Sequence, residues 1–287
     1  MNAHVDLSAP NRIDITGDDW KDIEPKEVTK RAVAKYAVAK YFNNALTDIE
    51  HKDDKEQSGD RNDLKVVGLG TGSTATWLVK ELGILLRQGS SNINRLKFVC
   101  TSQDTVTKAR AEGLQVVEVQ ELGTNPSVDL AIDGADEIDP AANIIKGRGG
   151  ALYREKLIEL LAKRFVVIAD SSKLVQKLGA GTLPVDIGTW STNAIMQRVE
   201  RVCHTLQGPV SMTIRNNQDE EPFRTDDGNY VLDVTFSNGI SDPVQLCREL
   251  KTINGVIETG LFVQMNPEVF TARQLDSSTV QISQLNY

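Results

Sequence analysis

Residues 64–87 read LKVVGLGTGSTATWLVKELGILLR and decide the fold of this 287-residue chain. The short apolar run 64–69 predicts a buried strand, and residues 74–87 have the apolar spacing of a helix. Between them lies GLGTGST, residues 68–74, whose glycines permit a tight turn. A strand, a glycine-rich turn and a helix in this order predict one unit of a parallel sheet covered by helices.

The same alternation continues on both sides of this stretch. Further strands are predicted at 96–100, 115–119, 128–132 and 165–169, and further helices at 26–43, 105–112 and 154–163. The predicted fold class is therefore α/β, with a mostly parallel, Rossmann-like sheet and helices on both faces. Sheets of this kind bind ligands at the carboxyl ends of their strands.

The pattern changes from about residue 184. A strand at VDI is followed by a helix from residue 192, strands in VSMTIR (210–215) and YVLDVTF (230–236), and a helix near 242–252. This strand–helix–strand–strand–helix order is typical of a small α+β unit. We expect a ferredoxin-like lid domain here.

The expected parts are a polar leader (1–24), a main α/β domain (25–183 and 254–287) and a small α+β domain (184–253). We expect the leader to be poorly ordered. Residues 256–262 and the segment TVQIS (279–283) are expected to return to the main sheet. The charged segment 51–63 is expected to be a solvated surface loop.

Composition excludes several classes of function. The formal net charge is -8, which argues against binding nucleic acid or an anionic membrane. Cys100, Cys203 and Cys247 are widely spaced and form no C-x-x-C pair, so neither a disulfide framework nor a zinc site is expected. No apolar run reaches the roughly 18–20 residues of a membrane span, and the polar N-terminus does not look like a signal peptide. We therefore expect a cytoplasmic protein.

The motif GLGTGST is a candidate phosphate site. Glycines let the backbone approach an anion, and the N-terminus of the following helix offers N–H groups and a positive dipole end. Ser73 stands where a dinucleotide fingerprint has its third glycine, and the lysine of a P-loop is absent. The alternative is a plain tight turn.

The motif DGADEID, residues 133–139, places four carboxylates at the end of a predicted strand. Three interpretations stay open: a site for hydrated Mg²⁺, a site that binds sugar hydroxyls and moves protons, or a solvated acidic loop.

The motif KGRGGALYREK, residues 146–156, brings Lys146 and Arg148 on a glycine-rich loop that leads into a helix. Cations on such a loop suit a negative charge that develops in a reaction. Glu155 lies in the first helical turn, where it is either a functional carboxylate or only a partner of the helix dipole. Lys30 and Lys173 are smaller candidates, with exposed lysine as the ordinary alternative, and TSQDT (101–105) favours a helix N-cap.

These motifs, in this order, resemble those of the ribose-5-phosphate isomerase family, type A. The resemblance extends from Lys30 to about Phe262, and IADSSK, GTLPVDI, DDGNYVLDV and GVIETGLF are also similar to segments of that family. The chain departs from the compact bacterial pattern in its leader and charged segment, in Arg148, in GTWST (188–192) and in NNQDEEPFR (216–224).

The resemblance implies a metal-free, cofactor-free aldose–ketose isomerase of the non-oxidative pentose phosphate pathway. It would interconvert ribose 5-phosphate and ribulose 5-phosphate through an enediolate and would form a homodimer or homotetramer. Glu155 would be the base and Lys146 would stabilise the negative charge, while Asp133 or Asp136 would assist ring opening. The remaining substrate-binding residues implied by the motifs are Thr71, Gly72, Ser73, Thr74, Gly134, Ala135, Gly147, Arg148, Gly149, Lys173 and Lys30.

Two other classes of function compete with this one. A sugar-phosphate sensor or deaminase of related α/β architecture should carry a DNA-binding segment or a catalytic histidine. A nucleotide-binding dehydrogenase should carry a fuller glycine fingerprint and an acidic residue about 20 positions further on, where this chain has SSNINR.

Overall fold

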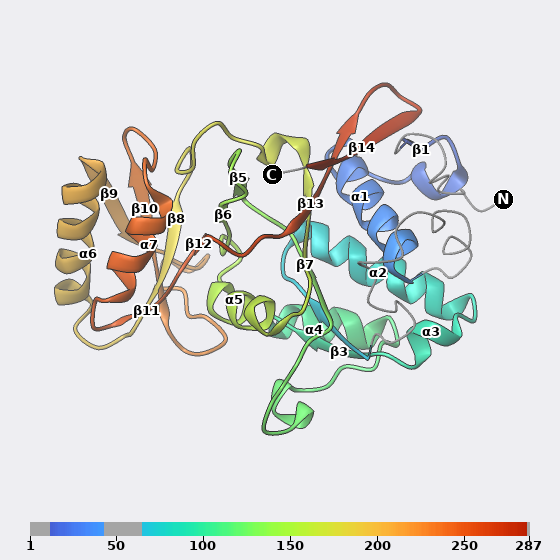
Figure 1. Ribbon diagram of the computed structural model, residues 1–287, viewed down its shortest axis with the longest axis horizontal. Helices are drawn as coiled ribbons and strands as arrows, with labels where there is room; N and C mark the ends of the chain where they lie inside the picture. Colours follow the sequence, from blue (N-terminus) through green and yellow to red (C-terminus); the bar gives the residue numbers. More distant parts are fainter. Residues whose placement is uncertain (1–11, 43–64, 286–287) are drawn as a thin grey trace. The chain divides into compact units, whose positions relative to one another are not determined.

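The computed structural model describes residues 12–42 and 65–285 (Figure 1). The charged segment 51–63 and the first eleven residues of the expected leader lie outside this range. The chain divides into two compact units, each of which is described by itself. The first unit comprises Met1–Gly134, Leu161–Ser171 and Glu268–Asn286, and the second consists mainly of Ala135–Leu160 and Ser172–Pro267.

The first unit contains a seven-stranded sheet in the order β1-β14-β13-β7-β4-β2-β3. Its parallel strands are β2 (Val66–Leu69), β3 (Lys97–Cys100), β4 (Leu130–Asp133), β7 (Phe165–Asp170) and β13 (Glu268–Gln274). Two antiparallel strands, β14 (Thr279–Leu285) and β1 (Arg12–Asp14), extend the edge beyond β13. The predicted mostly parallel sheet is confirmed, and its central strands are buried on both faces, as parallel strands usually are.

Helices bury one face of this sheet. They are α1 (Pro25–Phe42), α2 (Ser73–Arg87), the short α3 (Ser91–Asn94) and α4 (Gln103–Ala111). Helix α1 packs against β7 and β13 and lies beside α2 (Figure 1). Alternate strand residues such as Leu69 and Ile132 join apolar residues of both helices in one core. The burial of this apolar surface, at about 25 cal/mol per Å², is the main stabilising contribution of the unit.

Two expectations for the first unit are wrong. Residues 12–24 are not a disordered leader, because β1 pairs with β14 and the side chains of Ile13 and Trp20 are buried in the core. Residues 115–119 form no strand, since only Val116 bridges to Phe98 and a 3₁₀ turn begins at Val119. Glu118 and Glu121 cap that turn reciprocally, which gives the backbone local hydrogen bonds in place of a ladder.

The second unit contains an antiparallel sheet in the order β11-β8-β10-β9. Its elements are β8 (Leu183–Ile187), α6 (Thr192–Gln207), β9 (Val210–Ile214), β10 (Tyr230–Phe236), α7 (Pro243–Lys251) and β11 (Val256–Thr259). Leu183, Val185 and Ile187 pack in a core with apolar residues of α6 and α7. Because side chains alternate along a strand, Asp186 lies on the opposite face of the sheet.

A small three-stranded sheet and a helix complete the second unit. The sheet has the order β12-β6-β5, and its strands are β5 (Glu137–Ile138), β6 (Ile144–Ile145) and β12 (Leu261–Phe262). Helix α5 (Leu152–Leu161) follows β6 after the glycine-rich loop. The short segment Ser171–Lys173 forms a 3₁₀ turn after β7.

The boundaries between the two units differ from the expected domain boundaries at residues 184 and 253. Residues 135–160, 172–183 and 254–267 belong to the second unit, because β5 pairs with β6, β6 pairs with β12 and β11 pairs with β8. Residues 256–262 therefore do not return to the main sheet, whereas TVQIS does so as part of β14. The α/β class with a separate small antiparallel domain is confirmed. None of the described helices combines the length and apolar character needed to cross a bilayer.

Candidate functional site

In the first unit, the glycine-rich loop after β2 is fixed by the carboxylate at the end of β4. Oδ1 of Asp133 accepts hydrogen bonds from the backbone N–H of Thr71 at 3.1 Å and of Gly134 at 2.6 Å. A Cβ on Gly70 would lie only 1.8 Å from Cγ of Asp133, so this close approach requires glycine. Helix α2 begins immediately after Gly72. Its N-terminal N–H groups and dipole make this loop suitable for an anion, as the sequence predicts.

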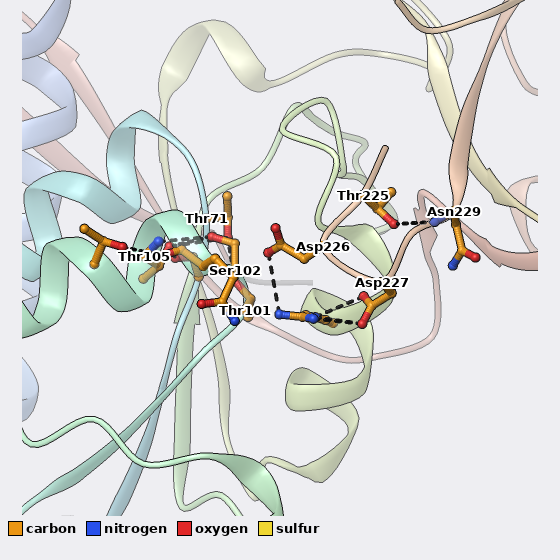
Figure 2. A network of polar contacts seen from close by, with 12 residues as sticks. Thr71, Thr101, Ser102, Thr105, Thr225, Asp226, Asp227 and Asn229 are labelled. Carbon is orange, nitrogen blue, oxygen red and sulfur yellow. Dashed lines mark hydrogen bonds and ion pairs between the residues drawn. The ribbon is translucent and has the colours of Figure 1, made fainter. Parts of the chain in front are cut away.

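Hydroxyl groups gather beside the same loop (Figure 2). Oγ1 of Thr71 lies 2.6 Å from Oγ1 of Thr101 and donates to Oγ of Ser102 at 2.8 Å. Ser102 also caps α4 by accepting from the N–H of Thr105, and Oγ1 of Thr105 donates to the carbonyl of Gly70. The predicted N-cap in TSQDT is thus confirmed, and the same residues hold the Thr71 side chain in place.

Lys30 contacts a residue of α1 that also contacts α2, while the two residues after Gly72 begin α2. The ammonium of Lys30 bonds to Oε1 of Glu27 at 2.7 Å, and the other carboxylate oxygen of Glu27 accepts from Nε1 of Trp77 on α2. Burial opposes ionisation of Glu27, but Lys30 and Trp77 outweigh it and lower the pKa of that carboxyl. Ser73 is exposed and Thr74 is half-buried in the first turn of α2. Lys30 is therefore linked to α2 through Glu27.

In the second unit, one lysine lies between two buried glutamates. Nζ of Lys146 is 3.9 Å from Oε1 of Glu155 and 3.5 Å from Oε1 of Glu159. The three residues are 2%, 3% and 3% exposed. Glu155 and Glu159 are one turn apart on α5, so both point to the same side of the helix. One positive and two negative formal charges in a dry environment interact strongly, which is typical of sites that move protons.

The glycine-rich loop that carries Lys146 is held by the DGADEID segment. Its Arg148 donates a backbone N–H to Oδ2 of Asp136 at 3.0 Å and a guanidinium N–H to Oε1 of Glu137 at 2.7 Å. The backbone N–H groups of Gly179, Ala180 and Gly181 also donate to Glu137. Arg148 is thus bound to the acidic segment through its backbone and its side chain.

The four carboxylates of DGADEID therefore bind different partners. Asp133 fixes the first unit's loop, and Asp139 accepts from backbone N–H groups of its own turn, at Ala141 and Asn143. Among the described residues, no three His, Cys, Asp or Glu side chains converge in a way that could hold a metal ion. The interpretation as a purely solvated loop is wrong for Asp133 and Glu137, which are buried.

The other predicted substrate residues lie on these segments. Gly134 ends the first unit and Ala135 begins the second, while Gly147 and Gly149 flank Arg148 in the loop. Lys173 is half-buried at the end of the 3₁₀ turn that follows β7. Their roles toward a substrate stay predictions.

Sequence reasoning missed Glu159 and the supporting role of Glu137. Glu159 could have been found, because its i+4 spacing from Glu155 places both carboxylates on one side of any helix that begins in this motif. Glu137 offered no comparable signal, since its partners are backbone N–H groups about 42 residues further on.

Asp186 is a further buried acid, on the small sheet of the second unit, and it is 1% exposed. Burial raises the pKa of Asp186 to about 7, and the charges of Asp227 and Glu258 act in the same sense. Asn229 and Lys251 act in the opposite sense. We expect this carboxyl to be neutral below about pH 7 and charged above it.

This shift predicts a stability that falls as pH rises. The folded chain keeps a proton on Asp186 between the ordinary carboxyl pKa near 4 and about 7, whereas the unfolded chain has lost it. Stability from this group is therefore complete at low pH and is lost as pH rises through about 7. Between pH 5.5 and 8, urea unfolding of wild type should lose about 2 kcal/mol more than Asp186→Asn does. Equal pH slopes for the two proteins would contradict the assignment.

The sequence of this chain matches those of known proteins. A family model described as ribose 5-phosphate isomerase A (phosphoriboisomerase A) matches residues 97–275. A curated relative from Arabidopsis thaliana, a probable chloroplastic ribose-5-phosphate isomerase 3, is 39% identical over 209 residues, which are 72% of this chain and 73% of that protein.

Solved structures agree. Ribose 5-phosphate isomerase from Plasmodium falciparum is 32% identical with a TM-score of 0.75, covering 91% of this chain and all of that chain. A D-ribose-5-phosphate isomerase in complex with phospho-erythronic acid is 29% identical with a TM-score of 0.74, covering 92% of this chain and all of that chain.

Proposed function

Because this chain belongs to the ribose 5-phosphate isomerase A family, we propose that it interconverts D-ribose 5-phosphate and D-ribulose 5-phosphate with Glu155 as the base. The chain is thus an aldose–ketose isomerase of sugar-phosphate metabolism, and the family places the reaction in the pentose phosphate pathway. The observation that carries the assignment of the base is the buried Glu155 carboxylate beside the Lys146 ammonium.

The reaction needs one group that accepts and returns a proton. In the open-chain sugar, the carboxylate of Glu155 removes the proton from C2, and the electrons move onto the aldehyde oxygen to give an enediolate. The same carboxyl then delivers the proton to C1, while the proton of the C2 hydroxyl passes to the oxygen on C1, which leaves a ketone at C2 and a hydroxyl at C1. Glu155 starts and ends the cycle ionised, so no other reactant is consumed.

Lys146 supplies positive charge where negative charge develops. The enediolate carries its charge on oxygen, and a preorganised ammonium in a dry site stabilises that charge far more than water does. Glu159 balances Lys146 in the resting protein, at 3.5 Å. The ammonium therefore lies within 4 Å of both carboxylates, at 3.9 Å from Glu155 and 3.5 Å from Glu159.

We propose that the phosphate group of the substrate binds to the glycine-rich loop of the first unit. We assign it to Thr71, Gly72, Ser73 and Thr74, with Lys30 and Lys173 as additional cations. The fixed Thr71 backbone and the start of α2 support this assignment. The isomerase solved with phospho-erythronic acid also holds a phosphorylated sugar acid. Binding energy at the phosphate orients the reacting carbons.

Ring opening is assigned to Asp133 or Asp136. Two backbone N–H groups donate to Asp133 and one to Asp136, so hydrogen bonds hold both carboxylates in place. The neighbouring Gly134, Ala135, Gly147, Arg148 and Gly149 are proposed to line the sugar.

A direct assay tests the function. Purified wild type should convert ribose 5-phosphate to ribulose 5-phosphate, measured by the absorbance of the ketose product, and the rate should be unchanged by excess EDTA. An inactive wild type would contradict the function. Loss of activity in EDTA would contradict the metal-free mechanism and leave the isomerase assignment standing.

Assembly and location are separate proposals. We propose a homodimer or homotetramer, supported by Tyr153, Leu157 and Leu160, whose apolar side chains are exposed on successive turns of α5. Light scattering measures the mass of the assembly in solution.

We propose a cytosolic location because phosphorylated sugars are charged and do not cross membranes unaided, although the Arabidopsis relative is named chloroplastic. Fractionation of cells against marker enzymes distinguishes the two compartments.

A further inference from the structure

The connection between β9 and β10 contains the segment NNQDEEPFR, which departs from the sequence pattern of the family. It folds back on itself, because Oδ1 of Asn217 accepts from the N–H groups of Asp219 and Glu221. As a result Phe223 returns beside Arg215, to whose carbonyl its N–H donates at 2.8 Å. The segment is thus an ordered turn that places these two side chains next to each other.

Arg215 joins this connection to the loop that carries Lys146. Its Nε and Nη2 donate to the two carboxylate oxygens of Asp233, Nε at 2.8 Å. Its Nη1 donates to the backbone carbonyl of Arg148 at 2.8 Å and to that of Gly147 at 3.3 Å. The planar guanidinium can serve both partners at once because Asp233 fixes its orientation, which a lysine at this position could not reproduce.

Phe223 packs against the end of the same loop. Gly150 has φ +83°, and a Cβ there would lie 2.5 Å from the ring of Phe223. The loop therefore meets the β9–β10 connection twice, through the carbonyls held by Arg215 and through the ring at Gly150.

The connection also holds the start of α5. Asp227 accepts from Nε and Nη2 of Arg154 at 2.9–3.0 Å, and Asp226 lies 3.5 Å from Nη1 of Arg154 (Figure 2). Arg154 immediately precedes Glu155. One segment of chain thus contacts both ends of the stretch from Lys146 to Glu155.

We propose that Arg215, oriented by Asp233, is a positioning residue that holds the 147–150 loop and thereby sets the place of Lys146 relative to Glu155. The proposal rests on the function proposed above. A displacement of about 1 Å in such a group can cost about a hundredfold in rate. Arg215 bonds backbone carbonyls of a loop that is also proposed to line the sugar, so its effect should fall mainly on turnover, with a smaller change in substrate affinity.

The test compares Arg215→Met, Arg215→Lys and Asp233→Asn with wild type. We expect kcat to fall about 10- to 100-fold in Arg215→Met, with KM for ribose 5-phosphate within about threefold. Arg215→Lys keeps the positive charge but cannot donate to Asp233 and to the loop carbonyls at the same time. Its kcat should therefore lie between those of Arg215→Met and wild type. Asp233→Asn should fall between the lysine variant and wild type. Arg224→Gln is the matched control, because Arg224 lies in the same connection and donates to Gly228 and Tyr230 instead of the loop.

A second readout separates positioning from folding. In Arg215→Ala, guanidinium ion at low millimolar concentration should restore part of kcat, whereas Arg224→Ala should show no response. An unchanged kcat in Arg215→Met, or a kcat loss equal to the loss of folded protein by circular dichroism, would overturn the proposal. An inactive wild type would overturn the proposed function instead, so the two failures are distinguishable.

Discussion

Glu155→Gln lowers kcat for ribose 5-phosphate by about a hundredfold to ten-thousandfold and changes KM by less than about threefold. The amide keeps the shape of the side chain but cannot accept the C2 proton, and a positioned general base contributes rate factors of this size. Substrate binding is assigned to other residues, so affinity is retained. Steady-state kinetics at saturating substrate measures the effect directly.

Glu200→Gln is the matched control for this change. Glu200 lies on an exposed position of α6 in the same unit, so the same chemical substitution there should leave kcat unchanged. A Glu155→Gln protein that turns over at the wild-type rate would assign the base elsewhere, with Asp133 and Asp136 as the next carboxylates to replace.

Lys146→Met has the second-largest expected effect, a fall in kcat of about a hundredfold to a thousandfold. The loss has the size measured when one preorganised donor is removed from a developing oxyanion. The variant loses the positive charge that favours the ionised form of Glu155, so the acid limb of the kcat/KM profile should move to higher pH. A pH profile of the variant checks the direction of this movement.

Removal of a buried charge also threatens folding. Breaking one partner of a buried pair costs about 3–5 kcal/mol. The double variant Lys146→Met, Glu159→Gln removes one charge of each sign and should recover stability in urea while kcat stays low. If the double variant regained wild-type turnover, Lys146 would act only as a structural counter-charge and the assignment would be wrong.

The strand–turn–helix units of the first sheet could be predicted because their signal is local. In β2 and α2 the apolar spacing, the glycine turn and the element lengths all lie within residues 64–87. The motifs at the strand ends follow from the same reasoning, because parallel strands all end at one edge.

Elements that depend on distant pairing were not predictable in the same way. Strand β13 includes polar residues such as Thr271 and Arg273, and it exists because it pairs with β7, about 100 residues earlier. The two-residue strands β5 and β6 are too short for any periodicity to show, and β12 completes their sheet.

The same distinction between local and distant signals applies to the residues of the candidate site. Glu155, Lys146 and Asp133 could be singled out from motif chemistry, whereas Arg215 could not, because its partners are backbone carbonyls 67 and 68 residues away in the sequence. Asp186 looks like an ordinary strand residue until the fold buries it and raises its pKa.

The central claim is a proton transfer through an enediolate by Glu155, and solvent exchange tests it most directly. Ribulose 5-phosphate is incubated with wild type and excess EDTA in D₂O, and the C1 hydrogens are followed by NMR. The mechanism predicts that one of the two C1 hydrogens is replaced by deuterium, because the proton on Glu155 exchanges with solvent during repeated turnovers, and that Glu155→Gln slows this replacement in parallel with kcat. Interconversion of the two sugars over many turnovers without any deuterium at C1 would contradict it, because the hydrogen would then pass directly between the two carbons.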